Sequence, residues 1–246
     1  SQVTNPPIDS LRENKVMSLK TRFGNLGNIL DFDTLTKENI YVLNSPILSN
    51  SQFNKFINFF GKNSLSIDCT FSNEENLFNA IERIQKESEI AVRQGITQII
   101  LSDKELSSKK MPMPMLLCVG AINTFLIEKK LRGYVSINVQ SGEALDTHSF
   151  ATLIGVGATT VNPYLAFDSL YQRYEKKLFG QYSFDDCVQR YIKSVNAGLL
   201  KIMSKMGISV LSSYRGGCNF ETVGLSRTIV DDYFPGVTSK ISGIGL

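Results

Sequence analysis

Histidine is almost missing from this chain of 246 residues, in which His148 is the only one. Histidine is the side chain whose charge changes most readily near neutral pH, and it is the commonest metal ligand. A single copy excludes every catalytic triad that needs a second histidine and every multi-histidine metal site. Because His148 stands at the start of a predicted helix, we expect it to be a structural or surface residue.

Cysteine is scarce, and its few copies are far apart. Cys69, Cys118, Cys187 and Cys218 form no Cys-x-x-Cys pair, and three of them stand beside apolar or aromatic residues in segments with strand or helix character. This pattern favours reduced structural thiols over disulfides or metal ligands, and it is typical of a cytosolic protein. We therefore expect no metal site and a cytoplasmic location.

Long apolar runs and strong net charge are also lacking. No run of 18 apolar residues occurs, and no basic-then-apolar leader opens the sequence, so we expect a soluble chain without a membrane partner. The formal charge of +3 arises from 26 basic and 23 acidic residues spread along the whole sequence. A charge so weak and dispersed predicts no nucleic-acid surface.

The glycine loops that hold phosphate are absent as well. "GNLGN" (24–28) lacks the third glycine and the preceding strand of a dinucleotide-binding fingerprint. Gly61-Lys62 is followed by Asn63, and Phe56 stands where a phosphate loop needs glycine. Both segments are better interpreted as turns. "YRGGCNF" (214–220) leaves two interpretations open: an arginine beside flexible backbone that binds an anion, or a glycine turn at a strand end.

What the sequence does contain is enough apolar material for a large core. Apolar residues make up 42% of the chain and the mean hydropathy is −0.04, and α/β barrels of this length often form one domain. We predict a single domain over residues 1–246, with residues 1–35 as an N-terminal linker and helical segment packed on it. Ser10 and Glu13 have the spacing of a capping box, which predicts a short helix to about residue 19.

Strands and helices alternate along the rest of the chain. Strands are predicted at 39–46, 65–71, 97–103, 134–142, 157–163 and 208–214, and helices at 51–61, 72–95, 114–130, 147–155, 183–205 and 226–234. In the helix over 72–95 we expect Ser72 or Asn73 as the cap and Ile90 on the buried face. Residues 104–115 are the one conspicuous long connection.

This alternation calls for crossover connections and a mainly parallel sheet. The fold class is therefore α/β, either doubly wound or TIM-barrel-like with a barrel that need not close. Asp103 and Glu105 follow a predicted buried strand, at the end where α/β barrels keep their active sites. Carboxylates at such places are more often helix caps or solvated loop residues, and the residues alone reveal no catalytic machinery.

Seven stretches taken together resemble the central domain of the large (alpha) chain of glutamate synthase. In order, they are "QVTNPPIDSLREN", "MSLKTRFG", "SIDCTF", "IILSDKELSSKKMPMPMLLCVGAIN", "HSFATLIGVGATTVNPYLAFDSL", "LLKIMSKMGISVLSSYRGGCNFETVGLS" and "YFPGVTSKISGIGL". The resemblance runs from residue 2 to residue 246. The chain departs from many relatives at "AINTFLI" (121–127) and "DTHSF" (146–150), where related chains are often richer in histidine.

The resemblance implies a non-catalytic domain of a larger enzyme that makes L-glutamate from L-glutamine and 2-oxoglutarate. A glutaminase domain would release ammonia, and an FMN-binding synthase domain with an iron–sulfur cluster would use it, both in the same polypeptide. The central domain resembles a relative of the synthase barrel without a cofactor of its own, and we expect it to hold the two sites in fixed relation and to wall the ammonia path. The electron donor would be NADPH, through a small FAD/iron–sulfur subunit, or ferredoxin; "SSYRGGCNF" is more similar to the bacterial pyridine-nucleotide-dependent chains.

Two other functions stay open on the sequence. One is a self-sufficient α/β-barrel enzyme that binds a phosphate-bearing cofactor through "GATTVNP" (157–163) or "YRGGCNF"; the other is a free-standing interaction module. The stiff opening "QVTNPPID" (2–9) also has two interpretations. Pro6 and Pro7 restrict the backbone and give a rigid approach to the first helix, and they would also hold Thr4 and Asn5 still at the entrance of the ammonia path.

Overall fold

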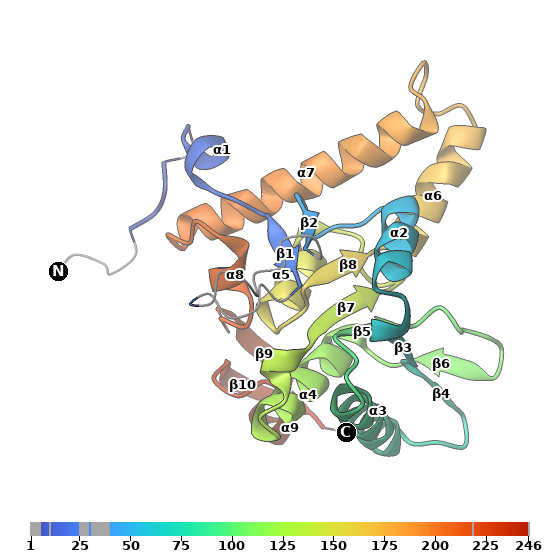
Figure 1. The fold of residues 1–246 in the computed structure, drawn as a ribbon, viewed down its shortest axis with the longest axis vertical. Coiled ribbons are helices and arrows are strands. Elements are labelled where there is room, and N and C mark those ends of the chain that lie inside the picture. Colours follow the sequence, from blue (N-terminus) through green and yellow to red (C-terminus); the bar gives the residue numbers. More distant parts are fainter. Residues whose placement is uncertain (1–5, 10, 25–29, 31–39, 218, 246) are drawn as a thin grey trace.

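A parallel sheet of four strands lies at the centre of the molecule (Figure 1). The computed structural model describes residues 6–9, 11–24, 30, 40–217 and 219–245. The strands lie in the order β3 (Ser64–Asp68), β5 (Gln98–Ser102), β7 (Ser136–Gln140) and β8 (Thr160–Asn162), and all neighbours run parallel. This confirms the predicted α/β class and mainly parallel sheet. Within the described residues the sheet is open and does not close into a barrel.

Three helices connect these strands and cover one face of the sheet. They are α3 (Leu77–Arg93), α4 (Met115–Glu128) and α5 (Thr147–Gly155), close to the predicted ranges. Alternate strand residues point to the same face, and on this face they are apolar and fully buried: Ile99, Leu101, Ile137, Val139 and Val161. The main hydrophobic core therefore lies between this face and the helices.

Helix α3 begins later than its sequence suggests. Its cap is Asn76, whose side chain accepts a hydrogen bond from the Asn79 amide, so the prediction of Ser72 or Asn73 was wrong. Ile90 was also misplaced: it is 55% exposed, whereas Ser88 on the same helix is fully buried. The Ser88 hydroxyl donates to the Gln85 carbonyl, and this hydrogen bond lets a polar residue occupy the inner face.

The N-terminal part of the chain covers the other face of the sheet. Strands β1 (Thr21–Phe23) and β2 (Tyr41–Leu43) pair antiparallel, so the strand predicted over 39–46 exists but does not join the central sheet as a regular strand. Helix α2 (Asn50–Phe60) begins at a capping box of Ser49 and Gln52 and ends at Gly61, where the short 3-10 turn η3 (Gly61–Asn63) follows. Its aromatic residues build a second core with residues of β1, β2 and β5: Phe23, Leu43, Leu48, Phe53, Phe56 and Ile100.

The first helix is shorter than predicted and is held differently. Ser10 lies outside the described residues, and α1 (Glu13–Val16) has Arg12 as its cap, with no side-chain hydrogen bond. Glu13 instead accepts hydrogen bonds from Lys201 Nζ at 2.6 Å and Ser204 Oγ at 2.8 Å. These donors hold the pKa of Glu13 below its ordinary value. The capping-box interpretation is therefore wrong for Glu13, because its carboxylate is used to attach α1 to a distant helix.

The long connection over 104–115 is partly a strand. β6 (Lys110–Pro112) pairs antiparallel with β4 (Thr70–Ser72), which follows β3 after a break at Cys69. Sequence alternation merged β3 and β4 into one predicted strand. The break matters because the Asp68 side chain, at the end of β3, accepts hydrogen bonds from Thr70 and from Lys110 Nζ at 2.9 Å and so joins the two segments.

Two long helices and a short one follow the sheet. They are α6 (Tyr164–Glu175), α7 (Phe184–Lys205), which begins at a capping box of Ser183 and Asp186, and α8 (Leu211–Tyr214). Figure 1 shows α7 as the longest helix, running from α6 to α8 along one side of the molecule. The strand predicted over 208–214 was wrong: Leu211 and Tyr214, three residues apart, are both buried, which is a helical spacing.

The C-terminal residues form a strand–helix–strand unit that the sequence analysis identified only in part. Helix α9 (Arg227–Tyr233) was predicted, but the flanking parallel strands β9 (Glu221–Leu225) and β10 (Thr238–Ile244) were not. Helix α9 packs on α4 where Gly120 leaves room: a Cβ atom there would lie 2.3 Å from the Phe234 ring. Within the described chain, no helix has both the length and the apolar character that a membrane span requires.

Substitution of Phe56 by Ala tests whether the second core holds the N-terminal part on the sheet. Phe56 is fully buried and its ring contacts Phe23 edge-on at 5.1 Å and Phe60 at 4.9 Å between centroids. We expect a loss of about 3–5 kcal/mol in the free energy of unfolding by urea. Phe59→Ala on the same helix is the control: Phe59 is 47% exposed, and its loss should cost less than about 1.5 kcal/mol. Equal losses for the two variants would contradict the assigned core.

Candidate functional site

The second face of the central sheet is polar, although it is buried. Residues at alternate positions of β5, β7 and β8 point to it. Six of them form hydrogen bonds with one another: Gln98, Ser102, Asn138, Gln140, Thr160 and Asn162. Ser136 and the apolar Ile100 lie on the same face. In-register pairing places Ser102 opposite Gln140, and Gln140 opposite Asn162. We call this set of six polar side chains the polar ladder.

The first rung of the polar ladder is centred on Asn138. Asn138 Nδ2 donates to Gln98 Oε1 at 3.1 Å and to the Ile99 carbonyl at 3.3 Å, and Thr160 Oγ1 donates to Asn138 Oδ1 at 2.7 Å. Asn138 and Thr160 are fully buried. Each amide atom of Asn138 therefore has a partner, and the rung crosses three strands without a charged group.

The second rung runs parallel to the first and reaches helix α2. Ser102 Oγ donates to Gln140 Oε1 at 2.9 Å, and Gln140 Nε2 donates to Asn162 Oδ1 at 3.1 Å. Asn162 Nδ2 then donates to Asn50 Oδ1 at 3.0 Å and to the Leu48 carbonyl at 2.9 Å. The rung thus connects the sheet to the first turn of α2. Burial of these groups is tolerated because they satisfy one another.

A short segment of chain pairs with the edge of the sheet beside this rung. Ile47 forms a parallel bridge with Val161, the Leu48 amide donates to the Val161 carbonyl at 2.9 Å, and the Val161 amide donates to the Pro46 carbonyl at 2.8 Å. Ser45 Oγ donates to Asn196 Oδ1 on α7 at 2.9 Å. The polar ladder is therefore enclosed by α2 and by this segment.

Asp103 lies at the carboxyl edge of the sheet, as predicted, and it is almost fully buried. Its carboxylate accepts hydrogen bonds from Ser141 Oγ at 2.6 Å and from the Gly142 amide at 3.0 and 3.1 Å. Partial burial raises the pKa of Tyr164, and the charge of Asp103 and a hydrogen bond with it act in the same direction. Asp103 thus ties the ends of β5 and β7 together. Glu105, by contrast, is exposed in the following turn and does not join it.

Glu143 is a carboxyl group near Asp103 that the sequence analysis did not single out. Its Oε2 accepts a hydrogen bond from the Met115 amide at 2.9 Å, at the first residue of α4. Partial burial raises the pKa of Glu143 and the charge of Asp103 adds to the effect, whereas the hydrogen bond opposes it. A carboxyl at a helix N-terminus is a stabilising arrangement, so this geometry is accounted for by helix capping.

The remaining predicted residues do not gather at this edge. His148 is exposed on α5, and Cys69, Cys118 and Cys187 are free, buried thiols. Burial and a hydrogen bond between thiols raise the pKa of Cys118, the bond with Cys69 being the larger cause. Cys218, Thr4 and Asn5 lie outside the described residues. Among the described side chains no group of three His, Cys, Asp or Glu could hold a metal ion.

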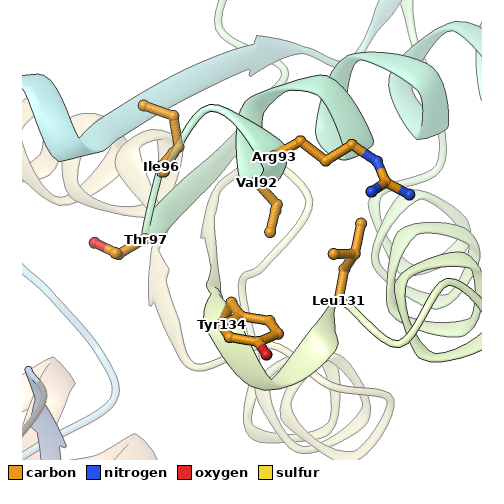
Figure 2. Close-up of a pocket in the computed structure, with 7 residues that line it drawn as sticks. Val92, Arg93, Ile96, Thr97, Leu131 and Tyr134 are labelled. Atoms are coloured by element: carbon orange, nitrogen blue, oxygen red, sulfur yellow. The ribbon is translucent and has the colours of Figure 1, made fainter.

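A hollow of about 480 Å³ lies at the opposite edge of the sheet, where α3 ends and β5 begins (Figure 2). Its walls are mostly apolar, with Val92, Leu131 and Tyr134 among them, and Arg93 lies at its rim. Arg93 is paired with Glu89 at 2.7 Å. The amino edge of the strands is not where α/β folds keep their catalytic groups, so this hollow is no candidate active site.

Sequence reasoning missed the polar ladder, although its signal is visible. "SINVQ" and "TVN" place polar residues two positions apart, and "QIILS" places them four positions apart, within apolar strands. A period of two indicates that one face of each strand is polar. What the sequence could not reveal is that the polar face is buried, because its cover comes from α2, far away in the sequence. Chemically, the ladder presents neutral amides and hydroxyls that exchange hydrogen bonds and carry no titratable group.

Comparison with known proteins identifies relatives along the whole chain. The family model described as "Glutamate synthase central domain" matches residues 1–226. The chain is 52% identical over 249 residues to the "Glutamate synthase [NADPH] large chain" of Azospirillum brasilense, and 43% identical over 248 residues to that of Bacillus subtilis. It is 38% identical over 261 residues to the chloroplastic "Ferredoxin-dependent glutamate synthase" of Spinacia oleracea. Each match covers 100% of this chain and 16% of the relative.

Solved structures give a weaker likeness. A variant of flavocytochrome b2 aligns with a TM-score of 0.46 and 14% identity, covering 81% of this chain and 46% of that one. The assignment to the α/β class rests on the sheet described above.

Substitution of Asn138 by Ala tests the role of the polar ladder. The change removes the partners of Gln98 and Thr160 and leaves both groups buried, and each unpaired group costs about 1–3 kcal/mol. We expect the free energy of unfolding by urea to fall by about 2–4 kcal/mol. Asn54→Ala, an exposed position on α2, should change it by less than about 0.5 kcal/mol. A loss for Asn138→Ala no larger than for Asn54→Ala would show that the ladder does not hold the sheet.

Proposed function

The chain belongs to the family of glutamate synthase central domains, and from this premise we propose that residues 1–246 form one non-catalytic domain of a glutamate synthase large chain. One observation carries the proposal: the match covers all of this chain but only 16% of the Azospirillum relative. The chain therefore corresponds to a segment of a longer polypeptide in those relatives. In this proposal the neighbouring domains hydrolyse L-glutamine and convert 2-oxoglutarate to L-glutamate.

The proposed role is to hold two active sites in a fixed relation. The fold supports this role because its sheet is tied on both faces: an apolar core on one side and the polar ladder with α2 on the other. In both rungs the side chains satisfy one another's hydrogen bonds, so the rungs make the sheet more rigid. A domain that transmits a fixed distance needs such internal connections more than it needs a binding pocket.

A second part of the proposal is that the domain walls an ammonia path. Ammonia protonates in bulk water and then loses its nucleophilic lone pair, so a path closed to solvent keeps it reactive. Thr4 and Asn5 would lie at the entrance of this path, where an amide and a hydroxyl can hydrogen-bond neutral ammonia. The stiffness of the Pro6-Pro7 pair would hold both side chains in place.

Cofactors and electron donors belong, in this proposal, to the parts of the large chain outside this segment. The synthase domain would hold FMN and an iron–sulfur cluster, and a small FAD/iron–sulfur subunit or ferredoxin would supply electrons in the cytoplasm. This chain would bind none of these groups. The rival function, a self-sufficient barrel enzyme with a phosphate-bearing cofactor, predicts the reverse.

An absorption spectrum of the purified chain separates these two functions. We expect no flavin absorbance and no formation of glutamate from glutamine and 2-oxoglutarate, because the groups that react would lie in other domains. The control is the complete large chain, purified in the same way and carrying its flavin. Flavin bound in a 1:1 ratio to the 246-residue chain, together with turnover, would replace the proposal by the barrel-enzyme function.

The ammonia path is tested by Asn5→Ala in the complete large chain. With amide-labelled ¹⁵N-glutamine and unlabelled ammonium in the buffer, we expect the variant to lose ¹⁵N from the glutamate it forms, because ammonia escapes at the entrance. Synthesis from added ammonium should be unchanged. Asn54→Ala serves as the matched control and should retain the label. If Asn5→Ala retains it as fully as the unmodified enzyme, Asn5 has no part in the path.

A further inference from the structure

Arg132 is a partly buried cation whose hydrogen bonds to the described residues go to neutral groups. It belongs to the 3-10 turn η4 (Arg132–Tyr134), just before β7. Its Nε donates to Asn123 Oδ1 at 2.7 Å, Nη1 to the Val135 carbonyl at 2.5 Å and Nη2 to the Gly157 carbonyl at 2.9 Å. Three of the five N–H donors of the guanidinium are thus fixed by backbone and amide oxygens.

The surroundings of Arg132 hold it in one position. Gly157 has φ +132°, a backbone conformation that favours glycine, and a Cβ atom there would lie 2.6 Å from Asn123 Oδ1. Asn123 on α4 and Gly157 after α5 therefore pack directly against each other, and Arg132 donates to both. These contacts hold the Arg132 guanidinium in one orientation, and they therefore also fix the directions of its two remaining N–H donors.

Arg215 brings a second cation to the same end of α5. It follows α8, and the Gly216 amide next to it donates to the Ile154 carbonyl in the last turn of α5 at 3.4 Å. The Nε of Arg215 is buried and has no hydrogen-bond partner among the described residues. Burial lowers the pKa of Arg132 to about 10, and the positive charge of Arg215 contributes in the same direction. Burial also lowers the pKa of Arg215.

Neither arginine has an acidic partner among the residues that the structure describes. Within the described part of the chain, no carboxylate oxygen lies within 4.0 Å of either guanidinium. The carbonyls at the end of α5 offset part of the charge, since a helix C-terminus carries about half a negative charge. Two partly desolvated like charges therefore lie at the same end of α5, an arrangement that costs free energy unless an anion completes it.

We propose that Arg132 and Arg215 form a binding site for an oxyanion, a phosphate or carboxylate group held between the two guanidinium forks. Planar guanidinium groups bind such oxyanions through paired charge-assisted hydrogen bonds. The site lies at the amino edge of the sheet, before β7 and β8, and is separate from Asp103 at the carboxyl edge. It lies outside the scaffold and ammonia-path functions proposed above.

Two sources can supply the oxyanion. One is a free anion such as inorganic phosphate; the other is an acidic side chain from a part of the large chain beyond this segment. Both present the same two oxygens to the arginines. The first arm of the test, on the 246-residue chain, is independent of the proposed function; the second arm, which distinguishes the sources, rests on it.

In the first arm, thermal unfolding is followed as inorganic phosphate replaces chloride at constant ionic strength. The melting temperature of the unmodified chain should rise and saturate, and Arg215→Gln should bind phosphate about tenfold or more weakly. Arg215→Lys, which keeps the charge but loses the fork, should lie between the two. Arg173→Gln changes an exposed arginine on α6; it should behave like the unmodified chain and also corrects for the general stabilisation by phosphate.

A second measurement needs no ligand. Without phosphate, Arg215→Gln should melt at the same temperature as the unmodified chain or higher, because it removes a like charge beside Arg132; far-UV circular dichroism checks its fold.

The second arm uses the complete large chain. There, a saturable response to phosphate identifies a free anion as the ligand, and loss of the response identifies an internal carboxylate. Equal phosphate responses in the unmodified chain, Arg215→Gln and Arg173→Gln, or no saturable response in any, would overturn the proposal.

Discussion

The structure depends on the requirement that buried amides be paired. Asn138 and Gln140 lie on an inner strand of the parallel sheet and Asn162 on its edge strand β8, and each finds its partners only if the strands keep their observed register. A shift of one residue would turn these side chains to the apolar face and leave them unpaired in the main core. The polar ladder therefore fixes the register more strictly than apolar packing could, since apolar side chains tolerate exchange far better than amides do.

Because the strands are in register, their amino ends form one edge of the sheet and their carboxyl ends form the other. These two edges carry different charges. At the carboxyl edge the buried carboxylate of Asp103 accepts hydrogen bonds from Ser141 and Gly142, which directly follow the next strand. At the amino edge the cation Arg132 meets only carbonyl and amide oxygens. The molecule thus completes one edge with its own residues and leaves an excess of positive charge at the other.

The parts that could be predicted from the sequence are those in which local pattern and final packing agree. The helix over 147–155 was predicted with both ends correct because Asp146 caps it and Gly157 follows it. The strand prediction over 208–214 was wrong. "ISVLSSY" has β-branched residues in its first half, which favour a strand, but burying both Leu211 and Tyr214 requires a helix. Glu13 was misassigned because its partners Lys201 and Ser204 are nearly two hundred residues away. The site was harder to predict than the fold, since the ladder and the arginine pair exist only through contacts between distant segments.

The pairing of residues 46–48 with β8 also affects how the chain can fold. The hydrogen bond from Asn162 to the Leu48 carbonyl spans 114 residues, so this edge of the sheet can form only after most of the sheet has been synthesised. Until then the aromatic side chains of α2 can contact Phe23 and Tyr41 but lack the cover of the completed sheet, and exposed apolar surface of this kind promotes association with other chains. Contacts of such long range also slow folding. The N-terminal aromatic cluster therefore stays partly uncovered in the nascent chain until the sheet on which it packs has formed.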